Sequence, residues 1–173
     1  MTTPAAAHRS FAKHGPKQSA RQLHNPPTAA CPCGTGKTYG ECCGLYHAGW
    51  YTGSLITPRL HAPTPEALMR SRYSAYALKL ADYLLGTWHG STAPGEIDFP
   101  PTKWLGLEIK HAETRGDAGV VEFIARYRDN TGRASRLHEV SRFISDGMGL
   151  DARWLYIDGQ IDDVQSPTSQ EAT

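Results

Sequence analysis

The chain has 173 residues, which leaves room for one ordinary domain and a small additional module but not for two large domains. Hydrophobic residues make up 39% of it, so a core can form, while no apolar run approaches the roughly 18 residues that cross a bilayer. The 18 basic and 17 acidic residues give a net charge of only +1. We therefore expect a protein with no membrane span and no specific readout of a nucleic-acid sequence.

The first 27 residues differ in composition from the rest of the chain. Their charged residues are all basic: Arg9, Lys13, Lys17 and Arg21. Because this stretch is rich in Ala, Ser, Gln, His and Pro and lacks apolar periodicity, we predict a disordered basic tail over residues 1–27. A transit peptide is the alternative interpretation, although Pro4, Gly15 and Pro16 would interrupt its amphipathic helix.

All four cysteines lie within thirteen positions of one another: Cys31, Cys33, Cys42 and Cys43. Cysteines that are adjacent or one residue apart close strained disulfide rings, and no secretory signal directs the chain to an oxidising compartment. Zinc, in contrast, needs four thiolates at tetrahedral corners, and a pair on each side of a short loop supplies them. The spacing predicts a Zn²⁺ site in a cytoplasmic protein.

The loop between the two cysteine pairs, residues 34–41, is rich in glycine, so its peptide N–H groups can approach the sulfurs. Four thiolates around a divalent cation leave a charge of −2, which Lys37 would partly offset. Gly36, Lys37 and Thr38 also match the end of a phosphate-binding loop. The first glycine of that pattern would fall at Cys31, however, and no buried strand precedes it, which argues against nucleotide binding.

The string CPCGTGKTYGECCG at residues 31–44 resembles the SEC-C motif, a small zinc-binding module also found at the carboxyl end of the SecA translocase. The motif reads C-x-C, eight residues, and then C followed by C or H. The resemblance implies four zinc ligands: Cys31, Cys33, Cys42 and Cys43. His47 is an alternative fourth ligand; otherwise it is expected to be an exposed histidine near a helix end.

Three later blocks of sequence resemble the bacterial YchJ family. They are APTPEALMRSRYSAY at 62–76, DYLLGTWH at 82–89 and RLHEVSRF at 136–143. Together with the cysteine string, the resemblance covers about residues 28–160. It implies a SEC-C segment followed by a domain similar to nuclear transport factor 2 (NTF2).

Two helices are expected after the cysteine motif. Thr64 is a favourable N-cap and Pro65 occupies the preferred first helical position. The apolar residues that follow form one helical stripe: Met69, Tyr73, Tyr76 and Leu80. A second short helix is predicted over 82–88, and prolines mark an irregular connection after it.

Apolar residues alternate from position 103 onwards, which predicts strands. The first strand is expected to place Leu105, Leu107 and Ile109 on one face. Three further strands are expected, with a turn at 129–132 between the first two of them: 121–127, 134–144 and 153–157. Asp158 and Gly159 are expected to close the last strand. Helices followed by a four-strand meander indicate an α+β domain, in which the helices cover one face of a curved, cone-like antiparallel sheet that can enclose a pocket.

The expected domain organisation is a small zinc knuckle at 28–50, an NTF2-like domain at 60–160 and a disordered tail at 161–173. Loss of the metal is expected to unfold residues 28–50 while the larger domain, with its own core, stays folded. Whether the knuckle is a tethered module or forms one wall of a pocket is left open.

Four polar side chains are candidates for a pocket or an ion pair: Arg72, His138, Glu139 and Arg142. On a regular strand His138 and Glu139 project to opposite faces, so they cannot serve one acid/base site. Arg72 is expected either to reach a pocket and meet Glu139 or an anionic ligand, or to form a surface or structural ion pair. Trp154 and Tyr156 share a face and line either a cavity or the core.

Three functions remain from different classes. The first is a non-enzymatic zinc-binding adaptor whose SEC-C knuckle presents a protein- or ribosome-binding surface. The second is a small-molecule-binding or enzymatic domain that uses the cone pocket, an interpretation supported by fold analogy. The third is a thiol-based metal-trafficking or redox protein, because C-x-C and vicinal cysteines exchange metal or oxidise. A zinc ion held by four protein ligands has no open position, which favours a non-enzymatic role.

Overall fold

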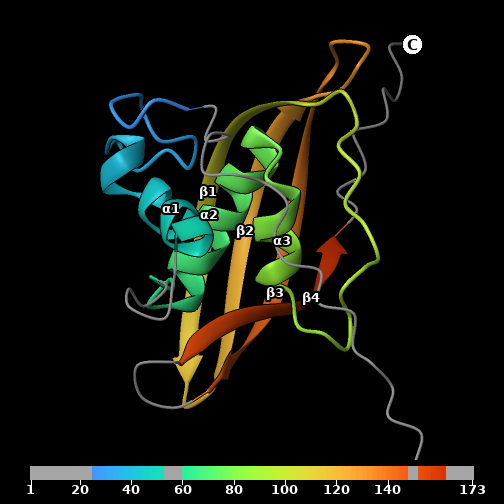
Figure 1. Cartoon of the computed structure of the whole chain (residues 1–173). Coiled ribbons are helices and arrows are strands. Elements are labelled where there is room, and N and C mark those ends of the chain that lie inside the picture. The colour runs from blue at the N-terminus through green and yellow to red at the C-terminus, as the bar shows by residue number, and fades with distance from the viewer. Residues whose placement is uncertain (1–24, 53–59, 148–151, 163–173) are drawn as a thin grey trace, which may run out of the picture.

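The computed structural model describes residues 25–52, 60–147 and 152–162 (Figure 1). The tails predicted at the two ends of the chain lie almost wholly outside these ranges. No helix within them is long and apolar enough to cross a membrane. The elements in chain order are the 3-10 turn η2 (Tyr39–Glu41), the helices α1 (Cys43–Thr52), α2 (Pro65–Leu78) and α3 (Ala81–Gly86), and the strands β1 (Lys103–Arg115), β2 (Ala118–Arg128), β3 (Ala134–Asp146) and β4 (Arg153–Asp162).

Helix α2 begins and ends where local chemistry dictates. The Thr64 side chain accepts a hydrogen bond from the backbone N–H of Ala67 at 3.1 Å, which confirms the predicted N-cap. At the other end Lys79 adopts the left-handed conformation and its N–H bonds to the carbonyls of Ala75 and Tyr76. The second predicted helix is α3, which ends at Gly86, two residues earlier than expected.

The four strands form an antiparallel meander in the order β1-β2-β3-β4, as predicted. The turn between β2 and β3 depends on Asp129, whose Oδ1 accepts hydrogen bonds from the backbone N–H groups of Thr131 and Arg133. Strand β4 extends to Asp162, so the prediction that Asp158 and Gly159 close it is wrong. A register shift between Arg142 and Phe143 of the partner strand lets the pairing continue past that point.

A second irregularity decides which side chain of β1 enters the core. The pairing of β1 with β2 shifts register between Trp104 and Gly106. Trp104 therefore packs against the core, whereas Leu105 is 44% exposed. The prediction that Leu105 shares the buried face with Leu107 and Ile109 is wrong at that one position, because a bulge breaks strict alternation.

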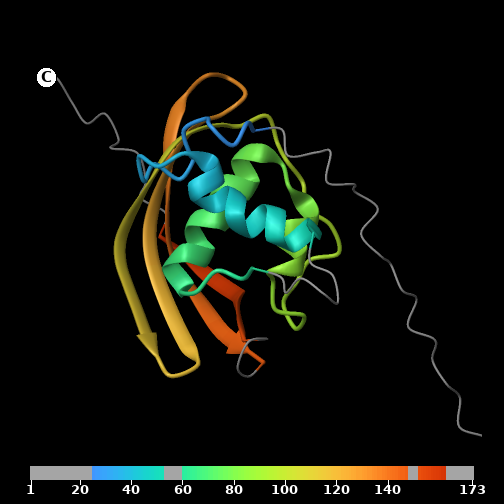
Figure 2. The same cartoon turned by 60° about the vertical axis from the view of Figure 1, so that its left-hand side comes forward.

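Helix α2 lies between the sheet and the cysteine-rich segment. It contacts β1, β2 and β4 on one side and α1 on the other, and Figures 1 and 2 show α2 and α3 lying in the concave face of the sheet. Buried residues of the cysteine-rich segment, of α2 and of the sheet belong to one hydrophobic cluster: Cys31, Cys33, Tyr39, Cys43, Leu68, Met69, Tyr73, Val121 and Phe123. The cysteine-rich segment thus shares a core with the sheet domain.

Candidate functional site

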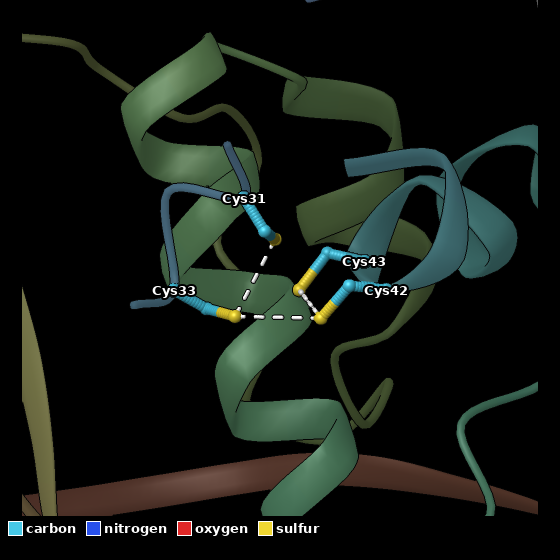
Figure 3. Close-up of side chains that lie close together, drawn as sticks. All are labelled: Cys31, Cys33, Cys42 and Cys43. Carbon is cyan, nitrogen blue, oxygen red and sulfur yellow. Dashed lines mark hydrogen bonds between the residues drawn. The ribbon is translucent and has the colours of Figure 1, made fainter. Parts of the chain in front are cut away.

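The four cysteine sulfurs converge on one point beside α2 (Figure 3). All four Sγ atoms lie within 4.8 Å of one another. The Sγ atoms are 3.4 Å apart for Cys31 and Cys33, 3.5 Å for Cys33 and Cys42, and 3.9 Å for Cys42 and Cys43. Sulfurs at the corners of a tetrahedron around zinc, each about 2.3 Å from the metal, are about 3.8 Å apart. The donor type and the spacing therefore both fit a tetrahedral metal ion.

The backbone between the two cysteine pairs makes a tight hairpin. The N–H of Cys31 bonds to the carbonyl of Lys37 at 3.0 Å, and the N–H of Gly34 bonds to the carbonyl of Cys31 at 3.1 Å. Gly34 and Gly36 have φ angles of 76° and 80°, a region that glycine adopts at little cost. The chain then passes through η2 and enters α1 at Cys43, which returns the second cysteine pair to the first.

Hydrogen bonds within the cluster shift the pKa values of Cys31 and Cys43 in opposite directions. Hydrogen bonds from the thiols of Cys33 and Cys43, with smaller contributions from their backbone N–H groups, lower the pKa of Cys31 to about 3. The pKa of Cys43 is raised, first by its bonds to Cys31 and Cys33 and then by burial. The neighbouring thiols thus stabilise one thiolate by hydrogen bonding. The negative charge of that thiolate makes ionisation of a further thiol beside it unfavourable. Four thiolates together require a cation at their centre.

Two hydroxyl groups that the sequence analysis did not identify lie beside the sulfurs. Thr35 Oγ1 is 3.5 Å from Cys33 Sγ and 3.3 Å from Cys42 Sγ. Ser74 Oγ on α2 is 3.8 Å from Cys31 Sγ. Ser74 is 43 residues away from Cys31 along the chain, so no local pattern could have paired them. Such outer partners orient metal ligands and tune their basicity.

His47 lies in the interface between α1 and α2, with both ring nitrogens hydrogen-bonded. Nε2 bonds to the carbonyl of Ser71 at 3.0 Å and must carry the proton, so Nδ1 accepts from the hydroxyl of Tyr39 at 2.7 Å. The residue is 0% exposed, which shows that the exposed position expected from the sequence is wrong. Its hydrogen bonds leave neither nitrogen free to act as the alternative fourth ligand.

Burial of His47 makes the stability of the protein depend on pH. Desolvation lowers its pKa from 6.5 to about 4. The unfolded chain therefore binds a proton at His47 more tightly than the folded chain does. The free energy of unfolding should be highest above pH 6.5 and should fall by about 3 kcal/mol as the pH is lowered to 4. Denaturant unfolding at a series of pH values measures this loss, and an NMR titration gives the pKa directly.

The control for this prediction is the variant His47→Gln. Acid also protonates the thiolates, and the variant keeps that contribution while losing the imidazole. The difference between the two stability curves therefore isolates His47. An imidazole that titrates near its ordinary value in the folded protein would contradict the prediction.

Arg72 is buried within the domain. Its Nη1 donates to the carbonyl of Leu84 at 2.8 Å and to Thr87 Oγ1 at 2.9 Å. The guanidinium carbon lies 4.8 Å from the ring centre of Trp88 and 4.5 Å from that of Tyr156. Burial lowers the pKa of Arg72, while these hydrogen bonds and aromatic faces stabilise its charge.

Arg72 and Glu139 line the same cavity, of about 200 Å³, between α2 and the inner face of the sheet. Glu139 Oε1 accepts hydrogen bonds from Ser141 Oγ at 2.6 Å and from the hydroxyl of Tyr156 at 3.1 Å. A Cβ atom at Gly159 would clash with the Glu139 side chain, so the glycine leaves room for the carboxylate in this position. Arg72 is thus buried at a cavity and not on the surface, and among the described residues it forms no ion pair with Glu139.

His138 and Arg142 lie on the opposite face of β3, as the alternation predicts. His138 Nε2 is 2.8 Å from Glu122 Oε1. Arg142 forms a bidentate pair with Asp158 at 2.7 and 2.5 Å. The four candidate polar residues therefore divide into two that line the cavity and two that form pairs on the outer face of the sheet.

Comparison with known proteins agrees with this architecture. Residues 64–159 match the YchJ middle NTF2-like domain, and residues 28–45 match the SEC-C motif. A UPF0225 protein of Bordetella parapertussis is 48% identical over 144 residues, which cover 80% of this chain and 99% of that protein. A UPF0225 protein of Ralstonia nicotianae is 50% identical over 145 residues, which cover 78% of this chain and 93% of the relative.

Two solved structures of SEC-C motif containing proteins are similar to this fold. The solution structure from Rhodopseudomonas palustris has a TM-score of 0.62 at 36% identity and covers 77% of this chain and 98% of its own. The crystal structure from Psychrobacter arcticus has a TM-score of 0.61 at 26% identity and covers 88% of this chain and 86% of its own. The chain therefore belongs to the YchJ family of UPF0225 proteins and carries a SEC-C motif ahead of an NTF2-like domain.

Proposed function

We propose that this protein is a non-enzymatic zinc protein, in which the metal holds the SEC-C segment against the NTF2-like domain. The observation that carries the proposal is the convergence of four cysteine sulfurs within 4.8 Å. Soft thiolate ligands in a tetrahedral arrangement favour zinc over harder cations such as Mg²⁺ and Ca²⁺. Protein sulfurs supply all four positions, so neither water nor substrate has a place on the metal.

Burial of the site supports a structural metal rather than a transferred one. Cys31, Cys33 and Cys43 are buried, and only Cys42 is half-buried. An incoming thiol or chelator must therefore displace packed side chains before it reaches most of the sulfurs. These are free cysteines, which suits a reducing compartment such as the cytoplasm. Slow release of zinc to a chelator supports this assignment, and release within seconds favours the metal-trafficking alternative.

The zinc site predicts a fixed stoichiometry. Purified, reduced protein should contain about one zinc ion per chain, as measured by elemental analysis. Cys33→Ser should lower this content severalfold, because serine is a poor zinc ligand and the sulfur of Cys33 lies within 3.5 Å of the sulfurs of Cys31 and Cys42. Glu41→Gln is the matched control, since Glu41 is exposed and adjacent to Cys42. Metal content near zero, or full occupancy after two cysteine replacements, would refute the site.

An interaction role is supported by the surface of the SEC-C segment. Cys43 and His47 of α1 are buried, whereas Leu45, which projects to the other side of this helix, is 43% exposed. Leu45 borders a hollow of about 470 Å³ whose further lining includes Pro26, Pro27, Tyr39 and Ala48. We infer that a protein partner places an apolar side chain in this hollow; a ribosomal protein is one such partner.

Two exposed leucines allow a matched test of this surface. Leu45→Ser should abolish recovery of a specific partner in a cross-linking pull-down, while the zinc content stays unchanged. Leu105→Ser, at a leucine of 44% exposure on the sheet, should retain the partner. Equal recovery with both variants would show that the partner binds elsewhere. Identification of the cross-linked protein decides between a ribosomal component and another protein.

A further inference from the structure

The cavity between α2 and the sheet has room for an aromatic ring. Its volume is about 200 Å³, and apolar cavities of about 150 Å³ bind benzene. The lining includes five aromatic side chains: Tyr73, Tyr76, Trp104, Phe123 and Tyr156. Flat aromatic walls favour a planar occupant, because rings stack offset or edge-to-face against one another.

Hydrogen-bond donors of Arg72 remain available in this cavity. A guanidinium has five N–H donors, and the structure uses Nη1 for Leu84 and Thr87. Within the described part of the chain, the Nε and Nη2 atoms of Arg72 have no hydrogen-bond partner, although the residue is only 2% exposed. Three N–H groups of a buried cation are therefore left for a ligand that carries an acceptor.

An acceptor of Glu139 remains available in the same cavity. Ser141 and Tyr156 both donate to Oε1, and Oε2 has no partner among the residues that the structure describes. Arg72 and Glu139 line the cavity together but do not form an ion pair with each other. A ligand that bonds to both residues would gain hydrogen bonds to a buried guanidinium and to a half-buried carboxylate within a largely apolar cavity.

The pair of charges selects the class of ligand. An anion would bond to Arg72 but be repelled by Glu139. A cation would bond to Glu139 but be repelled by Arg72. A neutral group that carries an acceptor next to a donor can bond to both residues, and its desolvation between apolar walls costs much less than that of an ion. We propose that this cavity binds a small, flat, neutral molecule with a carboxamide, or with the equivalent amide edge of a nitrogen heterocycle. The site shares no residue with the cysteine cluster, so this proposal and the zinc proposal can be tested independently.

Three probes of nearly the same shape test this inference on the full-length protein. Benzamide carries an acceptor and a donor, benzoate carries only acceptors and a negative charge, and benzamidine carries only donors and a positive charge. Benzamide should bind at least about tenfold more tightly than either of the others, as measured by NMR titration, with shifts at the backbone amides of Phe123 and Ala125. No binding at about 10 mM benzamide would overturn the proposal, because so small a ligand is expected to reach at least millimolar affinity. Equal or tighter binding of a charged probe would overturn it as well.

Variants on the two faces of β3 complete the test. Glu139→Gln keeps the size of the side chain but removes the charge, so the preference for benzamide over benzoate should fall severalfold. His138→Gln changes the adjacent residue on the opposite face and should leave the preference unchanged. Ala125→Leu, which adds three carbon atoms to a side chain lining the cavity, should block all three probes. Unchanged probe binding in folded Ala125→Leu would place the binding elsewhere; if that variant does not fold, the preference of Glu139→Gln decides alone.

Discussion

Removal of zinc should destabilise the whole described domain and not the SEC-C segment alone. Cys31, Cys33 and Cys43 belong to the same hydrophobic cluster as Tyr73 of α2 and Phe123 of β2. Structural zinc in finger peptides contributes an apparent 10 to 16 kcal/mol, roughly, which is comparable with the entire stability of a typical domain, about 5 to 15 kcal/mol. We expect chelation to lower the unfolding free energy by at least about 5 kcal/mol.

Denaturant unfolding with two probes measures this effect. Far-UV circular dichroism reports on the sheet, and tryptophan fluorescence reports on Trp50, Trp88, Trp104 and Trp154. With and without chelator, both probes should show one coincident transition that moves to lower denaturant when the metal is removed. Glu41→Gln should unfold like the unmodified protein. Melting of residues 28–50 with an unchanged sheet transition would show instead that the segment is a tethered module, which is one of the two alternatives that the sequence left open.

Replacement of Arg72 by methionine should be among the most destabilising single changes in the NTF2-like domain. The change removes hydrogen bonds to Leu84 and Thr87 and the charge that lies between Trp88 and Tyr156. It also leaves the Glu139 carboxylate without a cation in its cavity. Removal of one partner from a buried charged network costs about 3 to 5 kcal/mol, and at about 2 to 4 °C for each kcal/mol the expected fall in Tm is about 10 °C.

Arg142→Met is the control for this prediction. Arg142 also forms two close contacts, with Asp158, but its side chain is 64% exposed. Exposed pairs contribute at most about 1 kcal/mol, because solvent screens them and the side chains lose entropy. Thermal unfolding of the two variants under identical conditions compares the same arginine-to-methionine change at a buried and at an exposed position. A loss of stability for Arg72→Met no larger than that for Arg142→Met would contradict the assignment of Arg72 as a buried structural cation.

Local chemistry was sufficient to predict most elements and the candidate metal ligands. Thr64 and Pro65 mark the start of α2 because capping depends on neighbouring residues in the chain. Alternation along β3 places His138 and Glu139 on opposite faces, since side chains of a regular strand alternate. The four cysteines lie within thirteen residues, so a short hairpin is enough to bring them together. In each case the determining contacts lie close together in sequence.

Tertiary structure alone decided the irregular positions and the environments of the polar groups. A bulge in β1 exposes Leu105, and a bulge in β4 lets that strand continue past Gly159. Both depend on the pairing register with the neighbouring strand, which a single strand's sequence does not show. His47 is buried by Ser71 of α2, a residue 24 positions away, and not exposed as expected. Arg72 and Glu139 come from elements that are distant in sequence, and only the tertiary structure brings both side chains to the wall of one cavity. The sequence by itself determined the local elements and the four cysteines that are the candidate metal ligands. The shared core and the pair of charges in the cavity required the packing of α2 between the SEC-C segment and the sheet.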